Sequence, residues 1–356
     1  MDKGVGAFGM ISLLISFLVL ILGYAVYGRV AETVFAPDDR ETPAVAIHDG
    51  VDCVPLKTGR AFLIQLLNIA GTGPIFGALM GAVFGPVVFL WIVFGSILGG
   101  AVHDYMAGMI SSRHGGASIA ELSGTYLGKG AMWVMRVFSV ILLVLCGTVF
   151  VTSPAGFLDK LTPAWMNGTF WAVVILVYYL AATLLPIDKL ISKLYPIFGV
   201  LLITMAAAVI GGILFSGGKF TVPEISLRNL RPAGTPVWPY MFITVACGAI
   251  SGFHATQSPM IAKCIMSERV GRKVFYGAMI SEAVIALVWA AALRLHRTAI
   301  PAAFMSAVSV TYILTAQEGF RLGTAIAYPT GAAVAAGLFV VYCGLLRRRQ
   351  ANDPIS

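Results

Sequence analysis

Charged side chains are scarce in this sequence. Only 11% of its 356 residues are Asp, Glu, Lys or Arg, whereas 58% are hydrophobic, and the mean hydropathy is +0.89. Soluble domains are far richer in charge, so these values indicate an integral membrane protein. Apolar runs long enough for a bilayer core of about 30 Å predict about ten membrane spans. They lie at about 9–28, 61–79, 86–108, 131–151, 169–187, 194–215, 239–262, 274–293, 299–316 and 324–346.

Paired cysteines and nucleic-acid motifs are missing too. The five cysteines form no CxxC pair, which argues against a disulfide framework or a cysteine metal site. The short segments of alternating polarity that build outer-membrane barrels are absent as well. Because a helix satisfies its own backbone hydrogen bonds in lipid, we expect an all-α integral membrane protein with one membrane domain over residues 1–356. Its partners would include the lipid bilayer and no nucleic acid.

The net charge of +8 is best explained by membrane orientation. Basic residues gather in connections that the positive-inside rule places in the cytoplasm, with the N-terminus outside and 9–28 a retained span. The alternation fails after residue 273, because it would put Arg347, Arg348 and Arg349 outside. We therefore expect an odd number of spans to be missing there. The basic connections are 29–60, 113–129, 189–193 and 263–273.

Two apolar spans are interrupted near their centres. LLNIAGTGPIFGALMG (66–81) and CGAISGFHATQSP (247–259) each place glycine, hydroxyl residues and proline where a helix should be regular. Lipid tolerates such a break only where it is buried in protein or lines a wet cavity, and transporters place their sites at paired breaks. The simpler alternative is a proline kink with glycines that allow close helix packing.

The spacing of the two breaks predicts an inverted repeat. Five spans lie from the first broken span up to the second, so the two halves would have opposite orientation. The predicted transporter core has a first repeat at 61–215 and a second, incomplete repeat at 239–346, with 9–28 as an extra N-terminal span.

Ionisable side chains lie within the apolar spans, among them His103, Asp104, His254 and Glu282. Such residues are costly in lipid and usually face a cavity, a partner or a proton path. Asp104, His254 and Glu282 are therefore candidates for proton or ion coupling, with a structural hydrogen bond as the alternative. A haem between His103 and His254 would instead indicate a membrane oxidoreductase. The cluster of His48, Asp49 and Asp52 is interpreted as a structured cytoplasmic loop rather than a metal or catalytic site.

Several motifs together resemble the carbon starvation protein A (CstA) family. They are HDGVDCVP (48–55), AGTGPIFG (70–77), GGAVHDYM (99–106), SGFHATQSP (251–259) and YGAMISEA (276–283), and PAAFMSAVSVTYILTAQEGF (301–320) looks like that family's C-terminal region.

The resemblance implies a multi-pass transporter, not an enzyme, in the inner (plasma) membrane of bacteria or archaea. It would take up peptides or pyruvate in the carbon-starvation response, with a core like that of amino acid, polyamine and organocation transporters. No cofactor is implied, and the coupling ion would be H+ or Na+. By that analogy the substrate would bind at Ala70, Gly71, Thr72, Gly73, Ser251, Gly252, His254 and Thr256.

The chain also departs from the family pattern. Cys53 stands where an aromatic residue is expected, and His103 where Gln is expected. A stretch resembling TSGDTAFRSAR is missing, because MISEAVIA (279–286) passes directly into ALVWAAAL (286–293). We therefore expect an internally shortened member. A shortened, non-transporting paralogue acting as a membrane sensor or partner subunit is the alternative function, and the sequence leaves homo-oligomerisation open.

Overall fold

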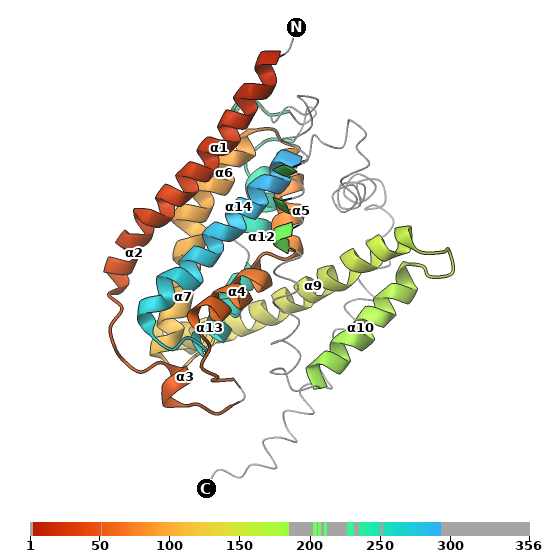
Figure 1. Cartoon of the computed structure of the whole chain (residues 1–356). Helices are drawn as coiled ribbons and strands as arrows, with labels where there is room; N and C mark the ends of the chain where they lie inside the picture. The colour runs from red at the N-terminus through yellow and green to blue at the C-terminus, as the bar shows by residue number, and fades with distance from the viewer. Residues whose placement is uncertain are drawn as a thin grey trace. The chain divides into compact units, whose positions relative to one another are not determined.

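The computed structural model describes residues 3–50, 52–184, 226–230, 235–249 and 252–292, with parts of 202–211. These residues are almost entirely helical, and no named strand occurs among them (Figure 1). The expected all-α architecture is confirmed at this level. The predicted spans 299–316 and 324–346, and most of 194–215, lie outside the described residues, as do Arg347, Arg348 and Arg349. The ten-helix inverted repeat therefore stays a prediction.

The helices are named here with their bounds. They are α1 (Lys3–Ala25), α2 (Tyr27–Phe35), α3 (Pro43–Ala46), α4 (Thr58–Ile69), α5 (Thr72–Ala82), α6 (Val87–Gly95), η1 (Ser96–Gly100), α7 (Ala101–Arg113), α8 (Ile119–Leu127), α9 (Lys129–Leu161), α10 (Gly168–Leu184), α12 (Tyr240–Ala249), α13 (Gly252–Ala262), η2 (Glu268–Val270), η3 (Arg272–Tyr276) and α14 (Gly277–Ala292).

Four helical stretches among the described residues are long and apolar enough to cross a membrane. They are Ile11–Phe35, Val87–Arg113, Lys129–Gly156 and Glu268–Ala291. A fifth follows if α4 and α5, which are bent by 56° at their junction, count as one broken span. Length and composition thus support a membrane protein.

The chain divides into two compact units. The first comprises Met1–Ser139 with Ala182–Val310, and the second Val140–Ala181 with Thr311–Ser356. The candidate site lies in the first unit. In the second, Tyr179 of α10 donates a hydrogen bond to the Phe150 carbonyl of α9, and the Trp171 indole of α10 donates to Thr162, the residue after α9.

Helix α14 occupies the centre of the first unit. It packs against α1, α4, α5, α6, α7 and α12, and most of its side chains are buried, including the fully enclosed Trp289. A helix that is apolar all round is stable in such a central position, because every face meets protein. Residues 279–292, which include MISEAVIA and all of ALVWAAAL except its last residue, form one uninterrupted helix, so the junction causes no break there.

Two of the four spans contain a π-helical turn. η1 precedes α7 and η3 precedes α14. The hydroxyl of Tyr276, the last residue of η3, donates a hydrogen bond of 2.9 Å to the carbonyl of Ile97 within η1. π-Turns occur often at functional sites. The two irregular turns are therefore joined directly to each other in the core.

Close packing of α7 on η3 depends on Gly108. A methyl group at Gly108 would lie 2.6 Å from two ring carbons of the buried Phe275. We expect Gly108→Ala to destabilise the purified protein by about 1–3 kcal/mol, because the core would be overpacked, and to lower its thermal unfolding midpoint.

The matched control is Gly59→Ala in α4, where an added methyl group would meet nothing within 4 Å. Alanine is the better helix former, so this variant should unfold at the parental temperature or slightly above it. Equal midpoints for the two variants would contradict the packing argument.

Candidate functional site

The first broken span is interrupted where the sequence predicts it. α4 ends at Ile69, and Ala70 (φ −80°, ψ 40°) and Gly71 (φ −82°, ψ −143°) leave the helical conformation before α5 begins at Thr72. Pro74 lies in the first turn of α5, where its missing N–H has no helical partner to lose. The backbone of Ala70–Gly73 is therefore partly freed from intrahelical hydrogen bonding.

The second predicted break falls between two helices of the described residues. α12 ends at Ala249 and α13 begins at Gly252. Ser251, a predicted substrate-binding residue, lies outside the described residues, and the side chain of Thr72 also lies outside them. Thr256 donates its hydroxyl to the Phe253 carbonyl at 2.8 Å, so this proton is used locally in the first turn of α13.

The first half of each broken span packs against the second half of the other. α5 lies against α12, where Gly81 contacts Val245, and α4 lies against α13. Gln65 of α4 donates a hydrogen bond of 3.2 Å to the hydroxyl of Ser258 of α13, and both side chains are fully buried. The helices of the two broken spans are thus packed together in one core (Figure 1).

Three of the predicted ionisable residues meet in this core. His254 on α13 places Nδ1 3.3 Å from Oδ2 of Asp104 on α7, and Nε2 3.6 Å from Oε2 of Glu282 on α14. All three side chains are at most 1% exposed. Neither contact has hydrogen-bond geometry. The distances are nevertheless short enough for charge attraction, and a small adjustment would allow a proton to move between the groups. We refer to Asp104, His254 and Glu282 as the buried triad.

His103 contacts the same carboxylate from the other side. Its Nδ1 lies 3.0 Å from Oδ1 of Asp104, and its side chain is about one-third exposed. Asp104 therefore lies between two imidazoles. Both nitrogens of His254 already face carboxylates, so this histidine has no nitrogen directed at a haem iron. The geometry does not fit the haem alternative, and the described residues contain no group of three His, Cys, Asp or Glu suited to a metal ion.

The charge of the triad is not balanced. Two ionised carboxylates and one protonated imidazole would leave a net charge of −1 in a buried region. A buried charge without a partner is costly, so such a site favours taking up a proton or a cation. Oδ2 of Asp104 and both carboxyl oxygens of Glu282 have no hydrogen-bond donor in this structure. The arrangement can therefore bind and release a proton within the core.

Gln65 was not recognised from sequence, and Ser258 was recognised only as a polar residue of the second break. Ser258 follows His254 by four residues, so the two side chains share one face of α13. Gln65 was visible only as one of two amide side chains, with Asn68, in an apolar run. Its carbonyl oxygen, Oε1, is buried and has no hydrogen-bond donor, so it adds an acceptor between α4 and α13.

The Gln65–Ser258 hydrogen bond leads to a double-mutant prediction. Ser258→Ala leaves the Gln65 amide buried without its acceptor, and we expect a loss of about 1–3 kcal/mol of stability. Gln65→Leu combined with Ser258→Ala removes both polar partners and should recover part of that loss. Thermal unfolding of the wild type, both single variants and the double variant measures the coupling. Additive losses would show that the hydrogen bond does not couple α4 to α13.

Comparison with known proteins gives a consistent result. The family described as carbon starvation protein CstA matches residues 8–166 and 158–321. An uncharacterized membrane protein of Haemophilus influenzae is 41% identical over 322 residues, covering 76% of this chain and 87% of that protein. Peptide transporter CstA of Bacillus subtilis is 27% identical, covering 78% of this chain and 57% of that protein.

A relative named for a different substrate also matches. The pyruvate/proton symporter BtsT of Escherichia coli is 26% identical over 336 residues, covering 76% of this chain and 46% of the symporter. The chain therefore spans about half the length of these named transporters. No solved structure matches the chain.

Proposed function

Because this chain belongs to the carbon starvation protein CstA family, we propose that it is a proton-coupled secondary transporter of peptides or pyruvate in the inner membrane, serving the carbon-starvation response. One relative is named a peptide transporter, and another is named a pyruvate/proton symporter. Transport by this chain is a proposal, because the chain spans about half the length of those relatives.

One observation carries the proposal. His254 lies between Asp104 and Glu282, in the core that holds both broken spans. Ionisable groups buried in a membrane protein are tolerated where they carry out a function, and proton relays in transporters use such carboxylate and histidine chains. A single histidine between two carboxylates can hold the transported proton while one conformation is exchanged for the other.

The same geometry favours a proton over Na+. A hard cation needs several oxygen ligands that converge on one point. Here the imidazole of His254 stands between the carboxylates of Asp104 and Glu282, so both present oxygen to a ring nitrogen, which can bind a proton. Proton uptake would neutralise the excess negative charge of the triad without displacing the imidazole.

The breaks are suited to the substrate's carboxylate. Peptides and pyruvate share that group, and the N-terminus of a helix favours a negative charge through its free N–H groups. α5 begins at Thr72, and α13 begins at Gly252 two residues before His254. In this proposal Ala70, Gly71, Thr72 and Gly73 bind from one break, and Ser251, Gly252, His254 and Thr256 from the other, with Asp104, His254 and Glu282 carrying the coupling proton.

Chain length favours a second candidate. The chain covers 87% of the Haemophilus influenzae protein but about half of the named transporters. A shortened, non-transporting paralogue acting as a membrane sensor or partner subunit would retain the triad as a structural feature.

Uptake by proteoliposomes separates the two candidates. Labelled pyruvate and a labelled dipeptide are offered to vesicles holding the purified protein, with and without an inward proton gradient. Accumulation of either compound that requires the gradient supports transport. If inserted, monodisperse protein accumulates neither compound, the non-transporting candidate is favoured.

Substitutions in the triad test the coupling. We expect His254→Ala and Glu282→Gln each to abolish gradient-driven uptake, because either change removes a proton-binding partner, while the protein still inserts. Glu41→Gln removes an exposed carboxylate in the loop after α2 and should leave uptake unchanged. Unchanged, pH-dependent uptake in both triad variants would refute the assignment of proton coupling to these residues.

A further inference from the structure

A third buried carboxylate lies at one end of the first unit, away from the two in the triad. Glu268 begins η2, and its side chain is completely buried although it carries a charge. Arg113, the last residue of α7, donates to both of its oxygens, from Nε to Oε1 at 2.9 Å and from Nη2 to Oε2 at 2.8 Å. This two-point contact is the strongest form of an arginine–carboxylate pair.

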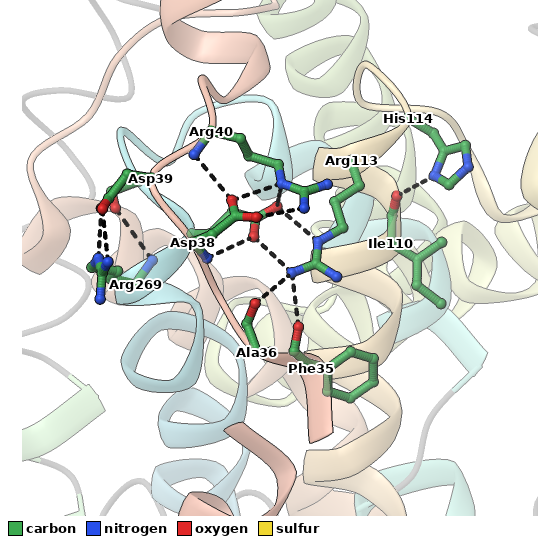
Figure 2. A network of polar contacts seen from close by, with 11 residues as sticks. Phe35, Ala36, Asp38, Asp39, Arg40, Ile110, Arg113, His114 and Arg269 are labelled. Carbon is green, nitrogen blue, oxygen red and sulfur yellow. Dashed lines mark hydrogen bonds and ion pairs between the residues drawn. The ribbon is translucent and has the colours of Figure 1, made fainter. Parts of the chain in front are cut away.

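The loop that links α2 to α4 is tied to the same pair. Figure 2 shows Arg113 reaching the carbonyl oxygens of Phe35 and Ala36, at 2.8 and 3.2 Å. The backbone N–H of Asp38 lies 3.4 Å from Oε2 of Glu268, and Nε of Arg40 lies 3.6 Å from Oε1. Glu268 thus holds the start of the loop to the ends of α7 and η2.

The rest of the loop follows the same surface. The Thr42 hydroxyl donates to the Ile265 carbonyl at 2.6 Å, and the backbone N–H of Leu56 donates to the Cys264 carbonyl at 2.9 Å. Lys263 pairs with Asp52 at 3.5 Å. The connections 29–60 and 263–273, which the positive-inside rule assigns to the same side of the membrane, therefore meet. Acidic residues of the first connection pair with basic residues of the second.

Buried ion pairs contribute little to net stability, because desolvation offsets most of the attraction between the charges. Their better attested use is to define one arrangement among alternatives. Breaking such a pair leaves a buried charge without a partner. The two charged residues therefore either stay paired, or separate together with the elements around them so that both reach water. A switching role therefore explains the complete burial of Glu268 better than stabilisation does.

The elements that hold this pair also hold the triad. α7 carries Asp104 and Arg113, nine residues or roughly 13 Å apart along the helix. α13 carries His254 and runs into the segment before Glu268, and the next span carries both Glu268 and Glu282. The π-turn η3 lies between these last two residues. Separation of Glu268 from Arg113 would therefore move the same helices that enclose the triad.

We infer that Arg40, Arg113 and Glu268 form a charge latch that closes this end of the bundle and must open before the buried triad can be reached from that side. This inference rests on the proposed function, because alternating access requires the triad to become reachable from each side in turn. The latch is closed in the arrangement described here. Its opening would free the loop over residues 36–57 from α7 and from the segment that follows α13.

A neighbouring ion pair serves as the matched control. Asp39 and Arg269 make contacts of 2.6 and 2.7 Å from the same loop to the same short helix, and Figure 2 shows them beside the latch. Both side chains are mostly exposed, so the pair contributes little. The Arg269 side chain lowers the pKa of the Asp39 carboxyl, which therefore stays ionised at neutral pH.

The test measures access to the triad without measuring transport. Ser258→Cys, in a chain whose five cysteines are replaced by Ala, puts a thiol on the buried face of α13 that His254 shares. Its modification by a membrane-impermeant methanethiosulfonate reagent is followed over time in monodisperse detergent-solubilised protein. We expect slow modification with the latch intact, and at least about tenfold faster modification after Glu268→Gln, which corresponds to about 1.4 kcal/mol in the opening equilibrium.

Arg40→Gln keeps the buried Arg113–Glu268 pair and removes the half-exposed arginine of the loop, together with its two hydrogen bonds to Asp38. It should also accelerate modification, and it decides the question if Glu268→Gln does not yield monodisperse protein. Asp39→Asn should modify at the parental rate. Parental rates in every well-folded latch variant, or equal acceleration by Asp39→Asn, would overturn the inference. Because the readout needs no substrate, absent uptake with accelerated modification would reject the proposed function and leave the latch intact.

Discussion

Charged groups buried in a membrane-spanning bundle must be paired with each other, because neither lipid nor a packed core can solvate them. This requirement decides how α7, α13 and α14 are arranged. Asp104, His254 and Glu282 come from these three helices, and each contributes one charge to the same small volume. The helices cannot slide past one another without separating these charges. The register of the core is therefore defined by electrostatics as well as by the close packing of Gly108 on Phe275.

The broken helices solve a related problem. Backbone groups at Ala70 and Gly71 leave the helical pattern in the middle of a span, and such groups are tolerated only inside protein or beside water. The crosswise packing of α5 on α12 and of α4 on α13 provides that enclosure. The start of α13 at Gly252 also lies two residues before His254 of the triad. Substrate recognition and proton binding would then occur in one enclosed region, where the charge of one ligand affects the binding of the other.

Much of this arrangement could be predicted from the sequence, because lipid imposes simple rules. The membrane character, the all-helical class, both breaks and the ionisable residues were visible from composition and local pattern. The inverted repeat and the substrate-binding roles of the residues at the breaks stay predictions, in part because residues 293–356 and Ser251 lie outside the described part of the chain. The haem alternative was reasonable from sequence, since two histidines in spans cannot be oriented without a fold. The structure turns both nitrogens of His254 toward carboxylates instead.

The sequence by itself determined where helices are interrupted and which spans carry charge, since both depend on residues that are neighbours along the chain. Only the tertiary structure decided which charges meet. His254 lies 150 residues after Asp104 in the chain, and Glu268 lies 155 residues after Arg113, yet each pair is in contact. From sequence Arg113 was one more basic residue on the cytoplasmic side, and its buried partner was not recognised. Pairings of this kind follow from the packing of distant helices, and local patterns of hydrophobicity and charge carry no information about them.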